Sequence, residues 1–125
     1  MRLIDTTIAV DYLRGVDTAV DLLERLLGSE EPVVASELVR FELLAGAREP
    51  ELETLARFFS ALAWAPVDEE VSRVSGLLSR RHRRTNTGID DADYLIAGTA
   101  IVLDAKLLTT NVRHFPMLTG LRSPY

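Results

Sequence analysis

The chain opens with MRLIDTTIAVDYL, residues 1–13, in which a short apolar run ends in an acid and a helix-forming segment follows at once. The run Met1–Asp5 is too short for a helix and predicts a strand. Thr6 or Thr7 can cap a following helix, and Gly15 can end it. A brief strand that leads directly into a helix is therefore the first structural unit that we expect.

The same alternation of short strands and helices continues along the chain. We expect further strands at Pro32–Ala35, Trp64–Val67 and Lys106–Thr110, helices at Asp17–Leu27, Ser36–Ala47, Glu51–Ala63, Asp68–Arg84 and Asp90–Leu103, and a polar loop at Thr85–Gly88. No internal repeat and no linker interrupts this pattern. Strands that alternate with helices predict an α/β fold with a parallel sheet covered on both faces.

Length and composition favour one globular domain. The chain has 125 residues, 47% hydrophobic and 26% charged, which excludes disordered and low-complexity classes. The absence of cysteine removes disulfides, thiolate metal sites and cysteine nucleophiles. There is no leader-like start and no apolar run of membrane-spanning length. We therefore expect a single domain over residues 1–125, with no membrane partner, in the cytoplasm.

The net charge of −5 conceals two halves of opposite sign. Residues 1–70 carry six Arg against fifteen Asp and Glu, which gives −9, whereas residues 71–125 carry eight basic residues against four Asp, which gives +4. The net charge argues against a phosphate-bearing partner, but the basic second half is compatible with one.

Candidate functional residues stand where the predicted strands end. In open parallel sheets, ligands collect beyond the carboxyl ends of the strands. The residues at the carboxyl ends of three predicted strands are Asp5, Ser36 and Asn111. Taken by itself, Asp5 is better explained as the N-cap of the next helix, and only the other candidate acids favour a functional role.

Glu42 lies in the middle of a predicted helix. At about 100° per residue it shares a side with Leu38, Phe41 and Ala45, whereas Arg40 points away. A carboxylate on a buried stripe is costly unless it is paired with a cation or binds a metal. We therefore expect Glu42 to be buried, and we favour metal binding over pairing with an arginine.

Three acids crowd the first turn of the last predicted helix. Compensation of the helix dipole accounts for one or two of Asp90, Asp91 and Asp93, but three like charges repel one another. Asp90 or Asp91 can cap the helix, whereas Asp93 shares a side with apolar residues and should point inward. Inward-facing Asp5, Glu42 and Asp93 would repel until a divalent cation neutralises them, and an all-oxygen ligand set indicates Mg²⁺ or Mn²⁺.

Four segments together resemble the PIN-domain ribonucleases, specifically the VapC-type toxins of toxin–antitoxin pairs. They are LIDTTIAVDYL at residues 3–13, SELVRFELLAG at 36–46, DADYLIAGTA at 91–100 and LLTTNVRHF at 107–115. Their order and spacing match the family over essentially the whole chain. The resemblance implies a PIN-like three-layer α/β/α fold with a central, mostly parallel sheet of four to five short strands.

The resemblance also implies a site and a reaction. Asp5, Glu42 and Asp93 match the family's main acidic positions, which hold Mg²⁺ or Mn²⁺. The implied activity is metal-assisted hydrolysis of RNA phosphodiester bonds by an endoribonuclease, with one or two ions.

Other site residues are less definite. Asn111 and His114 stand where many relatives carry an acid, so Asn111, Asp91 or a water could complete the ligand set. Thr6 matches a small hydroxyl position that orients a ligand or a bound water. We interpret His114 as a residue at the surface or at a strand end rather than as a catalytic acid.

Partners follow from the same resemblance. A VapB-like antitoxin should bind over the site, and the chain should form a homodimer. Leu13, Leu22 and Leu26 offer apolar side chains beyond what a small core needs, so we expect some of them in the dimer interface.

A cluster of arginines ends the helix that precedes the acidic one. It consists of Arg80, Arg81, Arg83 and Arg84. A solvated helix end and a contact with RNA explain this cluster about equally well.

Two other classes of protein fit parts of the pattern. A phospho-acceptor, receiver-like signalling domain would use Asp68 after the third strand together with Lys106, but it leaves Glu42 unexplained and needs two acids after the first strand. A catalytically inactive interaction module with the PIN fold is the other alternative, against which the three acids argue.

Overall fold

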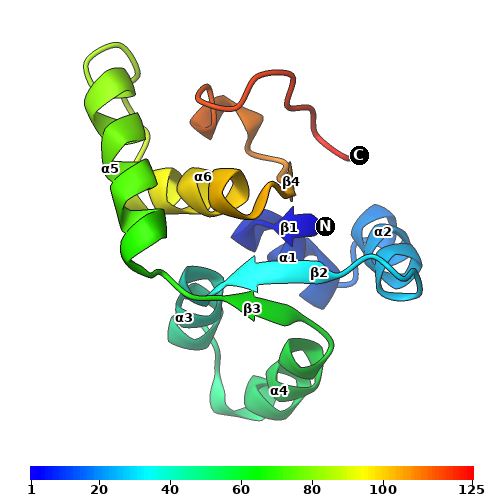
Figure 1. Ribbon diagram of the computed structural model, residues 1–125. Coiled ribbons are helices and arrows are strands. Elements are labelled where there is room, and N and C mark those ends of the chain that lie inside the picture. Colours follow the sequence, from blue (N-terminus) through cyan, green and yellow to red (C-terminus); the bar gives the residue numbers. More distant parts are fainter.

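The computed structural model describes all 125 residues and has a four-stranded sheet at its centre (Figure 1). The strands are β1 (Arg2–Ile4), β2 (Val33–Ser36), β3 (Ala63–Ala65) and β4 (Lys106–Leu108). All neighbours pair in parallel, in the spatial order β3-β2-β1-β4. The carboxyl ends of the strands therefore meet at one edge of the sheet.

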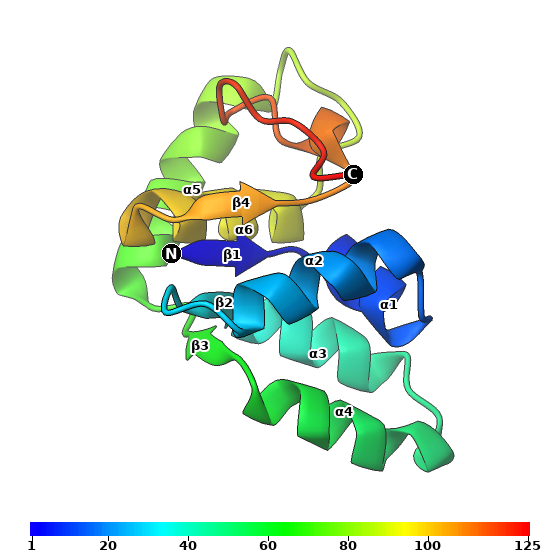
Figure 2. The same ribbon diagram turned by 90° about the vertical axis from the view of Figure 1, so that its right-hand side faces the viewer.

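Helices form the connections between the strands and cover both faces of the sheet. They are α1 (Thr6–Leu13), α2 (Asp17–Leu27), α3 (Glu37–Ala45), α4 (Leu52–Ser60), α5 (Glu69–His82) and α6 (Asp91–Leu103), with 3-10 turns η1 (Glu49–Glu51) and η2 (Val112–His114). Helix α2 lies on one face, and α5 and α6 lie on the other (Figures 1 and 2). The predicted α/β fold with a central parallel sheet is confirmed. None of these helices has both the length and the apolar character needed to span a membrane.

The core lies where the two helical layers meet the sheet. All four residues of β2 are buried, and so are Leu3 and Ile4 of β1. Successive side chains of a strand point to opposite faces, so an unbroken buried run requires cover on both faces. Phe115, which follows η2, closes the core from the C-terminal side and is 1% exposed.

Three polar side chains cap helices at predicted positions. The side chain of Ser36 accepts the amide N–H of Leu38, and Asp68 accepts that of Val71. Of the two acids that could cap α6, Asp90 does so. Each cap satisfies a backbone donor that the helix itself leaves unpaired.

The fourth predicted helix ends earlier than expected, and the residues around Ala63 form a strand instead. The helix expected over Glu51–Ala63 is divided into η1 and α4 and ends at Ser60. The residues after it are extended, because Ala63, Trp64 and Ala65 pair with β2 as β3. Strand β3 consequently begins one residue earlier than predicted and ends before Val67.

Strand β4 is shorter than the predicted run Lys106–Thr110. After the strand, the amide N–H of Thr110 donates to Oγ1 of Thr7 at 3.2 Å. The next amide, that of Asn111, donates to Oγ1 of Thr109 at 3.0 Å. These amides bond to side chains instead of continuing the strand ladder, so β4 ends where the polar residues begin.

Of the three leucines among which we expected some to lie in a dimer interface, one belongs to the core of the chain itself. Leu22 is 8% exposed, and the half-buried Leu13 and Leu26 pack against the core. The expectation is therefore wrong for Leu22, whereas Leu13 and Leu26 keep part of their surface exposed and their place in an interface stays a prediction. Dimerisation itself stays a prediction.

Helices α5 and α6 pack at close range through small residues. A Cβ atom on Gly98 would lie 1.9 Å from Oγ of Ser75 and 3.1 Å from the Ser75 backbone nitrogen. Contacts this short require the helices to move apart or the serine side chain to turn. Gly76, the residue after Ser75, is exposed and has open space where its Cβ would be.

We expect Gly98→Ala to lower the free energy of unfolding by about 2 kcal/mol, within the usual cost of overpacking. Gly76→Ala is the matched control on the exposed face. It should be neutral or stabilising by up to about 1 kcal/mol, because alanine has the higher helix propensity. Urea denaturation followed by circular dichroism measures both changes, and equal effects would show that the close approach of α5 and α6 does not constrain residue 98.

Candidate active site

Asp5 follows β1 directly and is 7% exposed. It occupies the N-cap position of α1, but its side chain makes no capping hydrogen bond. Its Oδ2 atom accepts the hydroxyl of Thr109 at 2.8 Å and that of Thr7 at 3.5 Å, and Oδ1 receives no hydrogen bond. The alternative role of Asp5 as a side-chain cap is therefore not realised, and the carboxylate faces the end of the neighbouring strand β4.

Asp93 lies in the first turn of α6, and its side chain is 15% exposed. Its Oδ2 atom accepts the amide N–H of Asp90 at 3.3 Å, while Asp90 caps the Asp93 amide at 3.0 Å. The same oxygen lies 3.0 Å from Nδ1 of His114. The prediction that Asp93 points inward while Asp90 or Asp91 caps the helix is confirmed, and the cap is Asp90.

The surroundings of Asp93 favour its neutral form. Burial raises the pKa of this carboxyl to about 6, and the negative charge of Asp90 acts in the same direction. The hydrogen bond from the Asp90 amide and, more weakly, His114 oppose the rise. No Lys or Arg pairs with Asp5 or Asp93, so neither carboxylate is neutralised by a side-chain cation other than a protonated His114.

Glu42 is exposed in the structure, so the expectation that it lies on the buried side of its helix is wrong. Helix α3 buries Val39 and Leu43, and Phe41, which we placed on the buried side, is 68% exposed. Glu42 instead lines a cavity of about 570 Å³ between α1, α3 and the start of α4. Thr6, the residue after Asp5, lines the same cavity, so the two predicted site residues do face a common space.

The three predicted acids do not form one compact group. No three Asp, Glu or His side chains lie close enough together to hold a metal ion as they stand. Asp5 and Asp93 are each linked to the segment that follows β4, through Thr109 and through His114. Both acids therefore lie at the carboxyl edge of the sheet, whereas Glu42 stands apart on the surface of α3.

The residues that hold the two acids are Thr7, Thr109 and His114, which sequence reasoning did not assign to the site. We expected Thr6 to support Asp5, but Thr7 makes the contact and no hydrogen bond joins Thr6 to Asp5. The position of Thr109 directly after a predicted buried strand was an available signal. His114 lies in η2 just beyond β4, with 37% of its side chain exposed, as its predicted place at a strand end implies.

Asn111 also lies at this edge of the sheet. It is half-buried, at the start of η2, and its amide bonds to Thr109, which bonds to Asp5. Asn111 is therefore connected to the Asp5 carboxylate by hydrogen bonds through one intervening residue, Thr109.

Asp91 and the arginines occupy the solvent side of the same region. The four arginines at the end of α5, Arg80, Arg81, Arg83 and Arg84, are all exposed. The Asp91 side chain is 92% exposed, and Arg83 lies 4.0 Å from it. Asp91 therefore points into solvent and does not complete the environment of Asp93.

The structure does not bring Asp68 and Lys106 together, as a phospho-acceptor signalling domain would require. Lys106 is the first residue of β4, so it lies at the edge of the sheet opposite to Asp5. Asp68 is engaged as the cap of α5. A lysine and an aspartate at these places cannot act together on one phosphate.

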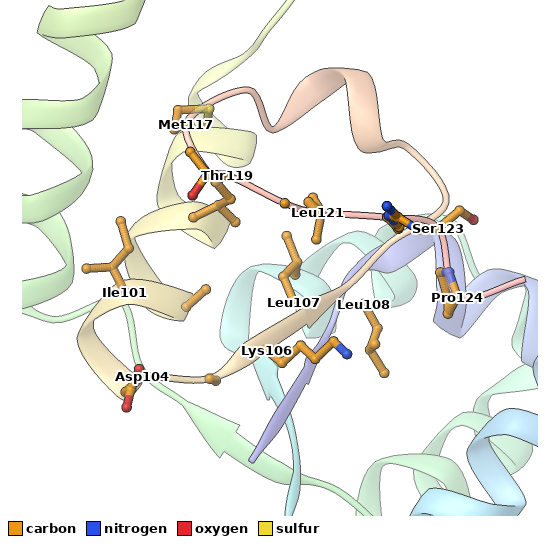
Figure 3. Close-up of a pocket in the computed structure, with 15 residues that line it drawn as sticks. Ile101, Asp104, Lys106, Leu107, Leu108, Met117, Thr119, Leu121, Ser123 and Pro124 are labelled. Atoms are coloured by element: carbon orange, nitrogen blue, oxygen red, sulfur yellow. The ribbon is translucent and has the colours of Figure 1, made fainter.

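A larger cavity, of about 660 Å³, lies elsewhere in the molecule (Figure 3). It is bounded by the end of α6, by β4 and by the last residues of the chain, with Ile101, Leu107 and Leu121 among its lining. Asp104 is the single acid that lines it. Asp93 lies at the opposite end of α6, so this cavity lacks the paired carboxylates of the candidate site.

Comparison with known proteins identifies the family. The family model of the PIN domain matches residues 2–117. The chain belongs to the PIN-domain family. It is 62% identical over all 125 residues to Ribonuclease VapC19 of Mycobacterium tuberculosis, which it covers completely, and 37% identical to Ribonuclease VapC10 of the same species, with 100% of this chain and 93% of the relative covered. The family resemblance read from the four sequence segments is thereby confirmed.

Solved structures of PIN-domain toxins share the fold. The chain superposes on a structure described as VapBC2 from Rickettsia felis bound to a DNA fragment from their promoter, with a TM-score of 0.82 and 25% identity, covering 96% of this chain and 94% of the other. PIN-domain ribonucleases generally depend on divalent metal ions. The donor set of this PIN domain fits such an ion, because two shielded carboxylates face one edge without an Arg or Lys partner.

The raised pKa of Asp93 makes the stability of this PIN domain depend on pH. The folded chain binds the Asp93 proton more tightly than the unfolded chain does, so the resulting stability is complete below about pH 4 and is lost as pH rises through about 6. In chelating buffer, wild type should lose about 2 kcal/mol relative to Asp93→Asn between pH 4 and pH 7. Urea denaturation at intervals across this range measures the difference, and a constant difference would show that Asp93 titrates at its ordinary pKa.

Proposed function

We propose that this PIN domain, spanning residues 1–125, is a divalent-metal-dependent endoribonuclease and the toxin of a toxin–antitoxin pair of the VapC type. The observation that carries the proposal is the pair of shielded carboxylates, Asp5 and Asp93, at the carboxyl edge of a parallel sheet. Ligand sites of open parallel sheets form at this edge. The full-length similarity to Ribonuclease VapC19 supports the same activity.

Asp5, Glu42 and Asp93 would hold Mg²⁺ or Mn²⁺ in this proposal. A divalent ion, when bound, supplies a Lewis acid that polarises the scissile phosphate and lowers the pKa of water. The hydroxyls of Thr7 and Thr109 hold Oδ2 of Asp5 and leave Oδ1 available. Glu42 stands apart from the two aspartates, and its support is the cavity that it lines together with Thr6, the residue after Asp5.

The remaining candidates have unequal support. Asn111 is supported by its hydrogen-bonded link through Thr109 to Asp5, and Thr6 by its place in the cavity beside Glu42. Asp91, with its carboxylate in solvent, has the weakest support.

The decisive test is cleavage of a structured RNA in the presence of Mg²⁺ or Mn²⁺. Asp5→Asn and Asp93→Asn should each reduce the cleavage rate at least about 100-fold, because each removes a charged ligand while keeping the side-chain shape. Asp21→Asn, on the exposed face of α2, is the control and should cleave like wild type.

Circular dichroism must show that all these variants fold. Cleavage that survives both Asp5→Asn and Asp93→Asn would contradict the assigned site. A folded wild-type chain that cleaves no RNA with either ion would favour the inactive interaction module instead.

RNA binding is proposed for the exposed arginines at the end of α5. One of them, Arg83, reaches Asp91 in the first turn of α6, which also carries Asp93, and α5 and α6 pack along one another. Guanidinium groups beside a phosphodiester-cleaving site can hold the RNA backbone through bidentate contacts.

Charge reversal tests this role. In an Asp5→Asn background that prevents cleavage, Arg80→Glu with Arg84→Glu should weaken RNA binding about tenfold and reduce the salt dependence of log Kd by about two ions. The control pair, Arg25→Glu with Arg57→Glu on exposed faces of α2 and α4, should change binding less. Fluorescence anisotropy at several salt concentrations measures both, and unchanged affinity of the first pair at low salt would contradict the proposal.

A VapB-like antitoxin is the protein partner that we propose. The Rickettsia felis structure is of a VapBC complex, and another structure with the same fold is described as a toxin-antitoxin complex from Klebsiella pneumoniae. The cavity beside Glu42 is lined by apolar residues that include Val10 and Leu43 and by the charged residues Arg14, Glu42 and Glu51. Such a surface suits a partner that covers the site.

A further inference from the structure

His114 contacts one of the two shielded acids. Its Nδ1 atom lies 3.0 Å from Oδ2 of Asp93, and the amide of Asp90 donates to the same oxygen at 3.3 Å. Oδ1 of Asp93 receives no hydrogen bond. An imidazole beside a carboxylate at this distance donates an N–H, which both the Nδ1–H tautomer and the imidazolium ion provide.

The two acids are held in the same way by different groups. Oδ2 of Asp5 accepts two hydroxyls, from Thr109 and Thr7, and its Oδ1 is left without a donor. Oδ2 of Asp93 has two N–H donors within reach, and its Oδ1 is also left without one. Each carboxylate thus has one oxygen fixed by the protein and one oxygen available to a cation.

We propose that His114 is a positioning residue, which fixes the Asp93 carboxylate so that Oδ1 is presented to the divalent ion. The inference rests on the metal site of the proposed function. Donors that orient a ligating carboxylate strengthen metal binding, and their loss typically costs about 10-fold to 100-fold in affinity. His114 acts through Asp93 and not through contact with the RNA.

The proposal distinguishes an orienting imidazole from a ligating one. A ligating imidazole would bind the ion through Nε2, because Nδ1 already faces Oδ2 of Asp93, and the shorter side chain of asparagine has no atom that reaches as far as Nε2. An orienting imidazole supplies only an N–H near the position of Nδ1. The side-chain amide of asparagine places an N–H at about the same distance from the backbone, so His114→Asn is the conservative variant.

Isothermal titration calorimetry with Mn²⁺ tests the proposal on the whole chain at pH 7.5. His114→Ala should weaken Mn²⁺ binding about tenfold, and His114→Asn should bind within about threefold of wild type. His82→Ala, at the end of α5, is the matched histidine control and should bind like wild type. Thermal unfolding in chelating buffer should give similar midpoints for all the histidine variants, which separates the effect from a loss of folding.

The outcomes separate this inference from the proposed function on which it rests. If Asp93→Asn weakens Mn²⁺ binding and His114→Ala does not, the positioning role is overturned and the metal site stands. If His114→Asn loses as much affinity as His114→Ala, the imidazole is itself a ligand and the positioning role is again overturned. If wild type binds no Mn²⁺, or if Asp93→Asn binds as well as wild type, the assigned metal site fails and the inference fails with it.

Discussion

Strand β1 pairs in parallel with β4, with Ile4 opposite Leu108, and the amide of Asp5 donates to the carbonyl of Leu108 at 2.9 Å. This pairing brings the residue after one strand beside the residue after the other, so the Thr109 hydroxyl reaches the Asp5 carboxylate. A shift of register by one residue would turn every side chain of β4 to the other face of the sheet. The environment of Asp5 therefore depends on the β1–β4 register, and β1 is held from its other side by β2.

The polar residues after β4 show how a short strand supports a site. Hydroxyl and imidazole groups of this segment contact Asp5 and Asp93, and its amides bond to Thr7 and Thr109. One segment thereby links the end of β1 to the start of α6. Shielding a carboxylate without a cationic partner is costly, and the raised pKa of Asp93 indicates that the donors around that acid offset only part of the cost. The chain therefore keeps Asp93 at a cost in stability near neutral pH, which is typical of sites that need a cation.

The structure shows where parts of the uneven charge of the sequence lie. The basic cluster at the end of α5 and the acidic first turn of α6 are joined by a short loop, and Arg83 approaches Asp91 across it. One positive group therefore lies near the first turn of α6, and no arginine pairs with the shielded acids. An anionic substrate can be attracted by the arginines while the carboxylates remain available to a metal ion.

The sequence by itself determined the alternation of strands and helices, the bounds of α2, the caps Ser36 and Asp68, and the placement of Asp5 and Asp93, because these follow from local periodicity and from residues adjacent in the chain. The expected cap of α1 by Thr6 or Thr7 is wrong, because α1 begins at Thr6 and has no side-chain cap. Only the tertiary structure decided which face of α3 is buried, and it turned Glu42 outward because Val39 and Leu43 meet the core. It also decided which groups hold the acids: Thr109 is 104 residues from Asp5, and His114 is 21 residues from Asp93. Contacts between residues so far apart depend on sheet register and helix packing, which no local pattern encodes.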